Sequence, residues 1–167
     1  MSDLPSTVEI HEEGPREGFQ IEPGPISTVD KVKLIDALSK TGLKHIQACS
    51  FVNPRLVPGW ADAEKVVESF DAHEDVEYTG LYFNGNGLDR ALAFKDKLTI
   101  SGSISLTASE GFTKKNLNRT HAENMGAMER HVMSHLELGI PVNRIGVMAA
   151  FGCNYQGDIS PATVIKT

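Results

Sequence analysis

Apolar runs suited to strands alternate along the chain with segments whose apolar residues are spaced as on one face of a helix. The second and fifth of these runs, HIQACSFV and RIGVMAAFG, are almost continuously apolar, which is typical of strands buried on both faces of a parallel sheet. The pattern predicts five strands, at residues 8–12, 45–52, 76–83, 97–106 and 144–151.

Helical segments are predicted between these strands. Ser27 resembles a helix N-cap followed by an acidic first turn, and Gly42 is a natural stop for that helix. Thr120-His121-Ala122-Glu123 has the sequence of a capping box, and Met125, Met128, Val132 and Leu136 follow it at helical spacing. Shorter helices are predicted at 61–70 and 87–94. Strands and helices in alternation predict an α/β fold with a parallel sheet and right-handed crossovers.

The last residues of the chain begin another helix. Ser160 suits the N-cap and Pro161 the first helical position, and only ATVIKT follows. Five strands are also fewer than the eight of a (β/α)8 barrel, which usually needs about 250 residues. The pattern therefore leaves two architectures open, an open five-stranded sheet and the first part of a larger barrel.

Composition narrows the class of protein. A chain of 167 residues that is 40% hydrophobic fits one globular domain, over residues 1–167. Its net charge of -6 argues against a partner that is nucleic acid or an anionic membrane, and no apolar run reaches the length of a membrane span. MSDLPSTVEI does not resemble a signal peptide, so we expect a cytoplasmic protein in which Cys49 and Cys153 are reduced thiols.

Four motifs then occur in a definite order. GPREGFQ follows the first strand, and SFVNPRLVPGWADAEKV, TASEGFTKKNLN and FGCNYQGDISPATV come later. From about Val8 onward they resemble successive landmarks of the 3-hydroxy-3-methylglutaryl-CoA lyase family, in its N-terminal portion. Without that resemblance, Arg16 and Glu17 of the first motif would be interpreted as a solvated loop pair.

The resemblance implies a (β/α)8 TIM barrel, of which this chain covers about the first five β/α units. It also implies a metal-dependent carbon–carbon lyase that splits a 3-hydroxy-3-alkylglutaryl-CoA into acetyl-CoA and a 3-keto acid, with Mg²⁺ or Mn²⁺ as cofactor. The family's His-x-His pair, metal-binding Asn and loop Cys come later than this chain extends.

We therefore expect an acyl-CoA substrate and an incomplete site, together with either self-association or a complementary C-terminal polypeptide. The alternative is a non-catalytic (β/α)5 remnant that acts as an interaction module. Five paired strands would leave unpaired sheet edges, which suit association in either case.

The resemblance assigns roles within the first motif. Arg16 would be the catalytic residue that polarises a substrate oxygen, because a guanidinium is permanently charged and has several donors. Glu17 would be the metal ligand, where the family has Asp. Gln47 also departs from the family, which usually has Glu at that position. These two differences leave the identity of the substrate open.

Substrate binding is predicted for a set of polar residues near the ends of strands. Each has a structural alternative, such as bonding loop backbone, packing inside the barrel, forming a turn or lying in a solvated loop. The candidates are Gln20, Gln47, Ser50, Asn84 and Lys114.

Cys153 and the pair His131 and His135 are two further candidates for a functional site. Cys153 follows the fifth strand, where a small buried residue and a functional thiol are equally compatible with the sequence. His131 and His135 are four residues apart, as in a zinc pair, but the intervening residues lack the general-base Glu, so an ordinary surface pair is favoured.

Overall fold

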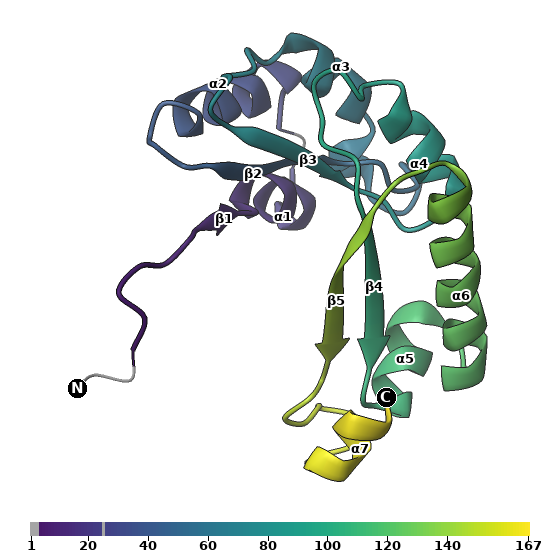
Figure 1. The fold of residues 1–167 in the computed structure, drawn as a ribbon. Helices are drawn as coiled ribbons and strands as arrows, with labels where there is room; N and C mark the ends of the chain where they lie inside the picture. The colour runs from purple at the N-terminus through teal and green to yellow at the C-terminus, as the bar shows by residue number, and fades with distance from the viewer. Residues whose placement is uncertain (1–3, 25) are drawn as a thin grey trace. The chain divides into compact units, whose positions relative to one another are not determined.

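The computed structural model describes residues 4–24 and 26–167, and strands and helices alternate through them as expected of an α/β chain. It contains two compact units, Met1–Ile100 and Ser101–Thr167, each with parallel strands and its own helices (Figure 1). The expectation of a single domain over residues 1–167 stays a prediction.

The first unit contains a parallel sheet of three strands in sequential order. The strands are β1 (His11–Glu12), β2 (His45–Ser50) and β3 (Glu77–Leu81). Their register aligns His11 with His45 and His45 with Glu77. His45 and Gln47 are partly exposed, whereas Ile46 and Ala48, which alternate with them, are buried, as expected for alternate residues of a strand.

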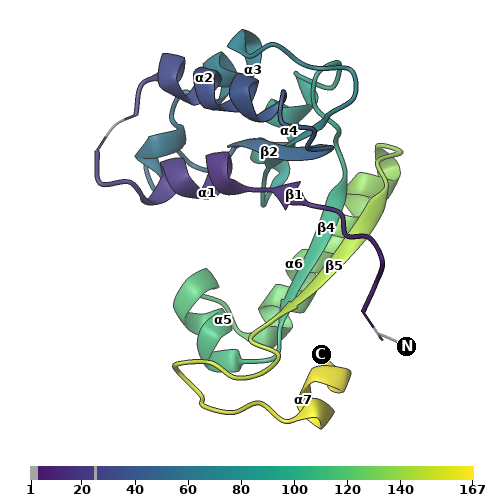
Figure 2. The same ribbon diagram turned by 90° about the vertical axis from the view of Figure 1, so that its left-hand side faces the viewer.

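Helices α2 (Thr28–Leu38) and α3 (Ala63–Ser69) lie together over the sheet of the first unit, and α4 (Gly85–Leu92) follows β3 (Figures 1 and 2). The apolar faces of α2 and α3 meet the buried side of β2, which places the core of this unit between the helix layer and the sheet. The core side chains include Ile35, Ile46, Val66, Val67, Phe70 and Tyr78.

The segment after β1 is a helix rather than the loop expected from its glycines and proline. Helix α1 runs from Gly14 to Ile21. Pro15 lies in the first turn, where its missing N–H costs no helical hydrogen bond and its fixed φ suits a helix. Gly14 and Pro15 therefore begin a helix directly after the strand.

Trp60 fixes α1 against the short 3-10 helix η1 (Pro58–Trp60). Its fully buried indole packs edge-on against Phe19, with ring centroids 5.9 Å apart, and its Nε1–H donates to the Arg16 carbonyl at 2.9 Å. A Cβ on Gly59 would collide with the Phe19 carbonyl oxygen, so this close approach requires glycine. Trp60 and Gly59 together hold the helix that carries Arg16.

The buried ammonium group of Lys31 also holds η1 in place. Lys31 of α2 donates from Nζ to the Gly59 carbonyl and to Asp62 Oδ1, both at 2.5 Å, and lies 4.9 Å from the centre of the Trp60 ring. Burial alone would raise the pKa of Asp62, but hydrogen bonds from Lys31 and Thr28 hold that pKa below its usual value. The charge of Lys31 is thus matched inside the fold.

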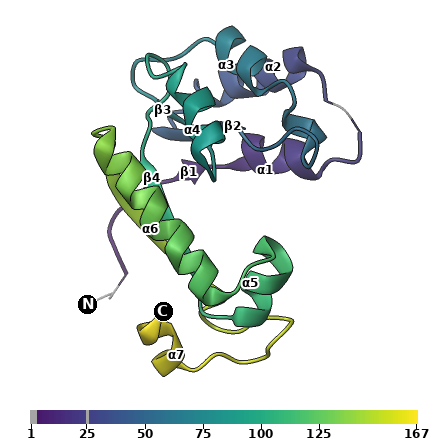
Figure 3. The same ribbon diagram turned by 90° about the vertical axis from the view of Figure 1, so that its right-hand side faces the viewer.

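The second unit pairs β4 (Gly102–Thr107) with β5 (Val142–Met148) in parallel, and α6 (His121–Glu137) runs along β4 (Figure 3). Two shorter helices, α5 (Glu110–Leu117) and α7 (Pro161–Lys166), complete it. The five strands are therefore divided between a sheet of three strands and a sheet of two.

The predicted helix starts are confirmed. The Ser27 and Ser160 side chains accept hydrogen bonds from backbone N–H groups three residues on, and Thr120 and Glu123 form the full capping box. Helix α5 was not predicted, since its sequence was interpreted as a loop. Its N-cap, Ser109, accepts from the Phe112 N–H at 3.1 Å.

The second unit corrects the expectation of a fifth strand buried on both faces. Ile145 in the middle of β5 is exposed, and Phe151 beyond the strand is 98% exposed. Among the described residues β5 pairs only with β4, and α6 packs chiefly on β4. Among the helices of residues 4–24 and 26–167, none is long and apolar enough to cross a membrane.

Trp60→Phe should destabilise the first unit by about 1–3 kcal/mol, because it removes a hydrogen bond to the Arg16 carbonyl and leaves a cavity. Trp60 is the chain's one tryptophan, so unfolding in urea has to be followed by circular dichroism. Leu56→Ala, at an exposed position, is the control and should leave the midpoint unchanged. An equal midpoint for Trp60→Phe and the original chain would contradict this role.

Candidate active site

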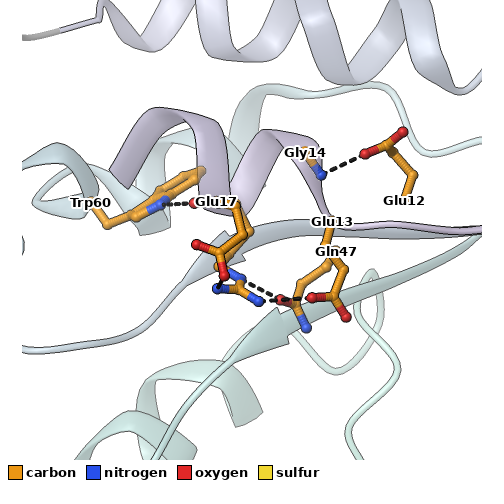
Figure 4. A network of polar contacts seen from close by, with 7 residues as sticks. Glu12, Glu13, Gly14, Glu17, Gln47 and Trp60 are labelled. Atoms are coloured by element: carbon orange, nitrogen blue, oxygen red, sulfur yellow. Dashed lines mark hydrogen bonds and ion pairs between the residues drawn. The ribbon is translucent and has the colours of Figure 1, made fainter. Parts of the chain in front are cut away.

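The guanidinium of Arg16 is the centre of a polar network at the carboxyl end of β1. Its Nε–H donates to Gln47 Oε1 at 2.5 Å, Nη2 to Glu13 Oε2 at 2.8 Å, and Nη1 lies 2.5 Å from Glu17 Oε1. In Figure 4 the side chains of Glu13, Glu17 and Gln47 converge on one region beside α1. The Arg16 side chain is 11% exposed, so these contacts replace most of its hydration.

The charges of the network do not cancel. One guanidinium faces two carboxylates, Glu13 and Glu17, while Gln47 contributes a neutral amide oxygen. Nε and Nη2 of Arg16 each donate one hydrogen bond in these contacts, and Nη1 forms an ion pair with Glu17. A guanidinium has five N–H groups, so these contacts leave donors for a further acceptor.

Sequence reasoning missed Glu13. The residue is the N-cap of α1, and its side chain makes no capping bond but reaches Arg16 three residues further on. Spacing of i to i+3 between an acid and a base on a helix was the available signal. It was overlooked because the segment was interpreted as a loop.

Ser50 and Gln20 flank this network in the sequence. Ser50 ends β2 and is fully buried, and in the described part of the chain its Oγ has no hydrogen-bond partner. An orphaned buried hydroxyl costs free energy, which makes it a natural position for a ligand contact. Gln20 lies half-buried in the second turn of α1.

A separate cluster in the second unit surrounds Cys153. Its Sγ lies 2.8 Å from Oγ of the fully buried Ser109, which is also 3.0 Å from Gln156 Oε1. The hydrogen bond with Ser109 lowers the pKa of the Cys153 thiol, against a smaller opposing effect of burial, and backbone N–H groups add to the lowering. A more acidic thiol is a better nucleophile and metal ligand at neutral pH.

Several curated proteins resemble this chain in sequence. No family model matches the chain. It is 39% identical over 167 residues to cytoplasmic 3-hydroxy-3-methylglutaryl-CoA lyase of Rattus norvegicus, covering 99% of this chain and 47% of that protein. It is 40% identical over 166 residues to mitochondrial hydroxymethylglutaryl-CoA lyase of Macaca fascicularis, covering 99% and 50%.

Solved structures agree. The chain superposes on hydroxymethylglutaryl-CoA lyase of Pseudomonas aeruginosa with a TM-score of 0.87 and 31% identity, over 98% of this chain and 53% of that one. The HMG-CoA lyase of Acinetobacter baumannii, solved with coenzyme A and 3-methylmalate, gives a TM-score of 0.81 and 30% identity, over 99% and 53%.

The resemblance seen in the sequence is confirmed, since the chain is similar to the N-terminal portion of 3-hydroxy-3-methylglutaryl-CoA lyases. It spans about half the length of the curated relatives it matches, in their N-terminal portion. The fold class predicted from the sequence is confirmed as well, since the neighbouring structures are TIM barrels and the strand pairs of this chain are parallel.

Within this chain, the predicted site residues are not all brought together. Arg16, Glu17 and Gln47 are in contact or share a partner. Asn84 lies in the same unit, where it is the N-cap of α4 and its Oδ1 accepts from the Gly87 N–H at 3.0 Å. Lys114 is exposed on α5 in the other unit. Their roles in substrate binding stay predictions.

The fit of a divalent cation to this network can be tested on its donors. Glu13, Glu17 and Gln47 offer carboxylate and amide oxygens, the ligands that Mg²⁺ and Mn²⁺ prefer. Glu17 is 53% exposed and is the most accessible of the three. The donor atoms of these residues are therefore of the kind that a hard divalent cation binds. They do not include three close His, Cys, Asp or Glu ligands, and in the described residues a cluster of that kind lies elsewhere.

His131 and His135 do not form the surface pair that the sequence favoured. His135 is fully buried, and its Nδ1 lies 2.7 Å from the His131 carbonyl oxygen. A Cβ on Gly102 would meet the His135 ring, so this imidazole packs directly on β4. Burial lowers the pKa of His131. The expectation of a surface pair was wrong because the helix face toward β4 carries these polar residues.

Ser109→Ala should raise the pKa of Cys153 and so slow its alkylation by iodoacetamide at pH 7–8, since the thiolate is the reacting form. Cys49 is the internal control: it is fully buried, and burial raises the pKa of its thiol. Rates at each cysteine can be followed by mass spectrometry across pH.

Ser109→Thr keeps the hydroxyl and the helix cap and should retain fast alkylation of Cys153. An unchanged pH profile in Ser109→Ala would show that the hydroxyl does not tune this thiol.

Proposed function

We propose that this chain provides the substrate-polarising part of a hydroxymethylglutaryl-CoA lyase-type enzyme. The observation that carries the proposal is the Arg16 network, in which a largely buried guanidinium follows β1 directly. In TIM barrels the reacting groups gather at the carboxyl ends of the strands. The reaction would be retro-Claisen cleavage of a 3-hydroxy-3-alkylglutaryl-CoA to acetyl-CoA and a 3-keto acid.

Arg16 would bind the oxygens on which negative charge develops. Removal of the 3-hydroxyl proton forms the new carbonyl as the carbon–carbon bond breaks, and the bonding electrons pass to the acetyl-CoA enolate, which is then protonated. The remaining N–H groups of Arg16 would donate to substrate oxygens during this step. Because Glu13, Glu17 and Gln47 hold the guanidinium in place, little reorganisation would be needed.

Glu17 is the residue we propose for holding Mg²⁺ or Mn²⁺, with other ligands from outside this chain. When bound, such a cation supplies Lewis-acid stabilisation of substrate oxygens. Glu17 is one methylene longer than the family's Asp, which gives its carboxylate enough reach to pair with Arg16.

An acyl-CoA is the proposed substrate, which the Acinetobacter baumannii relative supports through its complex with coenzyme A and 3-methylmalate. Ser50 would donate its orphaned hydroxyl to the acyl group, and Gln20, Asn84 and Lys114 remain candidates for further contacts. Gln47 replaces the family's usual Glu with a neutral amide, so we expect the acyl portion to differ from 3-hydroxy-3-methylglutaryl.

The proposal includes a second polypeptide segment, either another copy of the chain or a complementary C-terminal part. Exposed apolar residues of the second unit, Ile145 and Phe151, support association. A cytoplasmic location is also part of the proposal. The curated relatives include both cytoplasmic and mitochondrial forms.

Arg16→Lys should lower turnover at least about 100-fold without unfolding the chain, because Lys lacks the planar fork that bonds Glu13, Gln47 and substrate oxygens together. The assay would co-express the chain with the C-terminal half of the Pseudomonas aeruginosa lyase and follow acetyl-CoA release from 3-hydroxy-3-methylglutaryl-CoA and longer 3-alkyl analogues.

Arg55→Lys, at an exposed position, is the matched control and should keep full turnover. Near-normal turnover in Arg16→Lys would remove Arg16 from its role. A stable complex that cleaves none of these thioesters would favour the non-catalytic interaction module instead.

A further inference from the structure

A second group of chemically reactive side chains lies at the opposite ends of the strands from Arg16. His11 is the first residue of β1 and His45 the first of β2, and the parallel register pairs them directly. Glu9 lies two residues before His11, so strand periodicity brings its carboxylate to the same side. Nothing in the proposed lyase chemistry uses these three residues.

The three side chains already face one another. Glu9 Oε1 contacts His45 Nε2 and lies 3.7 Å from His11 Nε2. The two imidazole rings stack with centroids 4.1 Å apart and planes 11° apart. One potential ligand atom from each residue lies within 4.8 Å of the other two.

Glu77 completes the arrangement from the third strand. It is the first residue of β3, in register with His45, and its Oε2 lies 3.4 Å from His45 Nδ1. His45 therefore has one nitrogen facing Glu9 and the other facing a carboxylate. In proteins, a metal-binding His usually donates its second N–H to a carboxylate or carbonyl in this way, which fixes its tautomer and orientation.

We propose that Glu9, His11 and His45 bind a transition-metal ion of the Zn²⁺ class, with Glu77 as the positioning residue behind His45. Two imidazoles and one carboxylate are a recurrent zinc ligand set that leaves a fourth position for water. Imidazole nitrogen favours Zn²⁺, Co²⁺, Ni²⁺ or Cu²⁺ over the hard cations Mg²⁺ and Mn²⁺.

Only small movements are needed to close the site. Atoms bound tetrahedrally to one Zn²⁺ at about 2.0–2.1 Å lie about 3.3 Å apart, so the ligand atoms must approach one another by at most about 1.5 Å. The Glu9 and His11 side chains are 63% and 56% exposed, whereas His45 is 24% exposed. The two mobile ligands can therefore rotate toward the one that the sheet and Glu77 hold.

The site is separate in chemistry from the Arg16 network, although the two are close in sequence. His45 and Gln47 are two residues apart on the same face of β2, which is roughly 6.6 Å along a strand. Gln47 contacts Arg16, and His45 contacts Glu9 and Glu77. A metal bound by His45 would thus lie two residues along β2 from the Gln47 contact with Arg16, at the amino end of the strand.

The test is titration of the chain with Co²⁺, followed by visible absorption and then by displacement with Zn²⁺. We expect one Co²⁺ per chain, intense bands of four-coordinate geometry, displacement by one equivalent of Zn²⁺ and no displacement by millimolar Mg²⁺. His45→Gln, His11→Gln and Glu9→Gln should each abolish these bands. Glu77→Gln should weaken binding about 10–100-fold while retaining the band shape.

Two control variants make the outcome decisive. His73→Gln changes another exposed histidine outside the cluster, and Glu17→Gln changes the proposed lyase ligand; both should bind Co²⁺ normally. Retained binding in His45→Gln and His11→Gln, or loss in Glu17→Gln instead, would overturn the proposal. Circular dichroism of each variant separates loss of ligands from loss of the fold, and His11 and Glu9 lie on the surface where substitution costs little stability.

Discussion

Keeping the Arg16 guanidinium largely out of water requires that its charge be matched and its N–H groups be bonded. Helix α1 places Glu13 and Glu17 on either side of it, and β2 places the Gln47 amide against its Nε. The helix is in turn held through the Arg16 carbonyl by Trp60. The direction in which α1 leaves β1 is therefore fixed by one residue bonded through both its side chain and its backbone.

Two departures from the family's usual residues become intelligible in this network. Gln47, where the family usually has Glu, places a neutral amide beside Arg16. Glu13, at the N-terminus of the helix that carries Arg16, supplies a negative charge. Glu17, with its longer side chain, reaches back to the guanidinium while remaining half exposed. The positive charge is thus compensated locally, from α1, rather than across the sheet from β2. The end of β2 carries the neutral Gln47 amide and the buried Ser50, whose hydroxyl has no hydrogen-bond partner in the described residues.

Sequence patterns predicted those features that depend on local rules. The caps at Ser27, Thr120 and Ser160 follow from side chains bonding nearby N–H groups, and the strand order follows from alternating units. Helix α1 was missed because Gly14 and Pro15 are strand breakers that are equally good at a helix start. Ser109 and the buried His135 were missed because their contacts with Cys153 and with β4 are set by packing between elements, which no single window of sequence reveals. Glu13 was missed for a local reason, because its segment was interpreted as a loop and its i to i+3 spacing to Arg16 was not considered.

A parallel sheet separates chemistry by strand end, and this chain uses both ends. The carboxyl ends carry oxygen donors and a fixed guanidinium, suited to hard cations and developing oxyanions. The amino ends carry His11, His45 and Glu77 in one register row, because parallel pairing without an offset brings the first residues of neighbouring strands together. Imidazole and carboxylate donors select a different class of ion from oxygen donors alone. Two cation preferences can therefore coexist on one sheet without competing, provided that each ligand set stays at its own end of the strands.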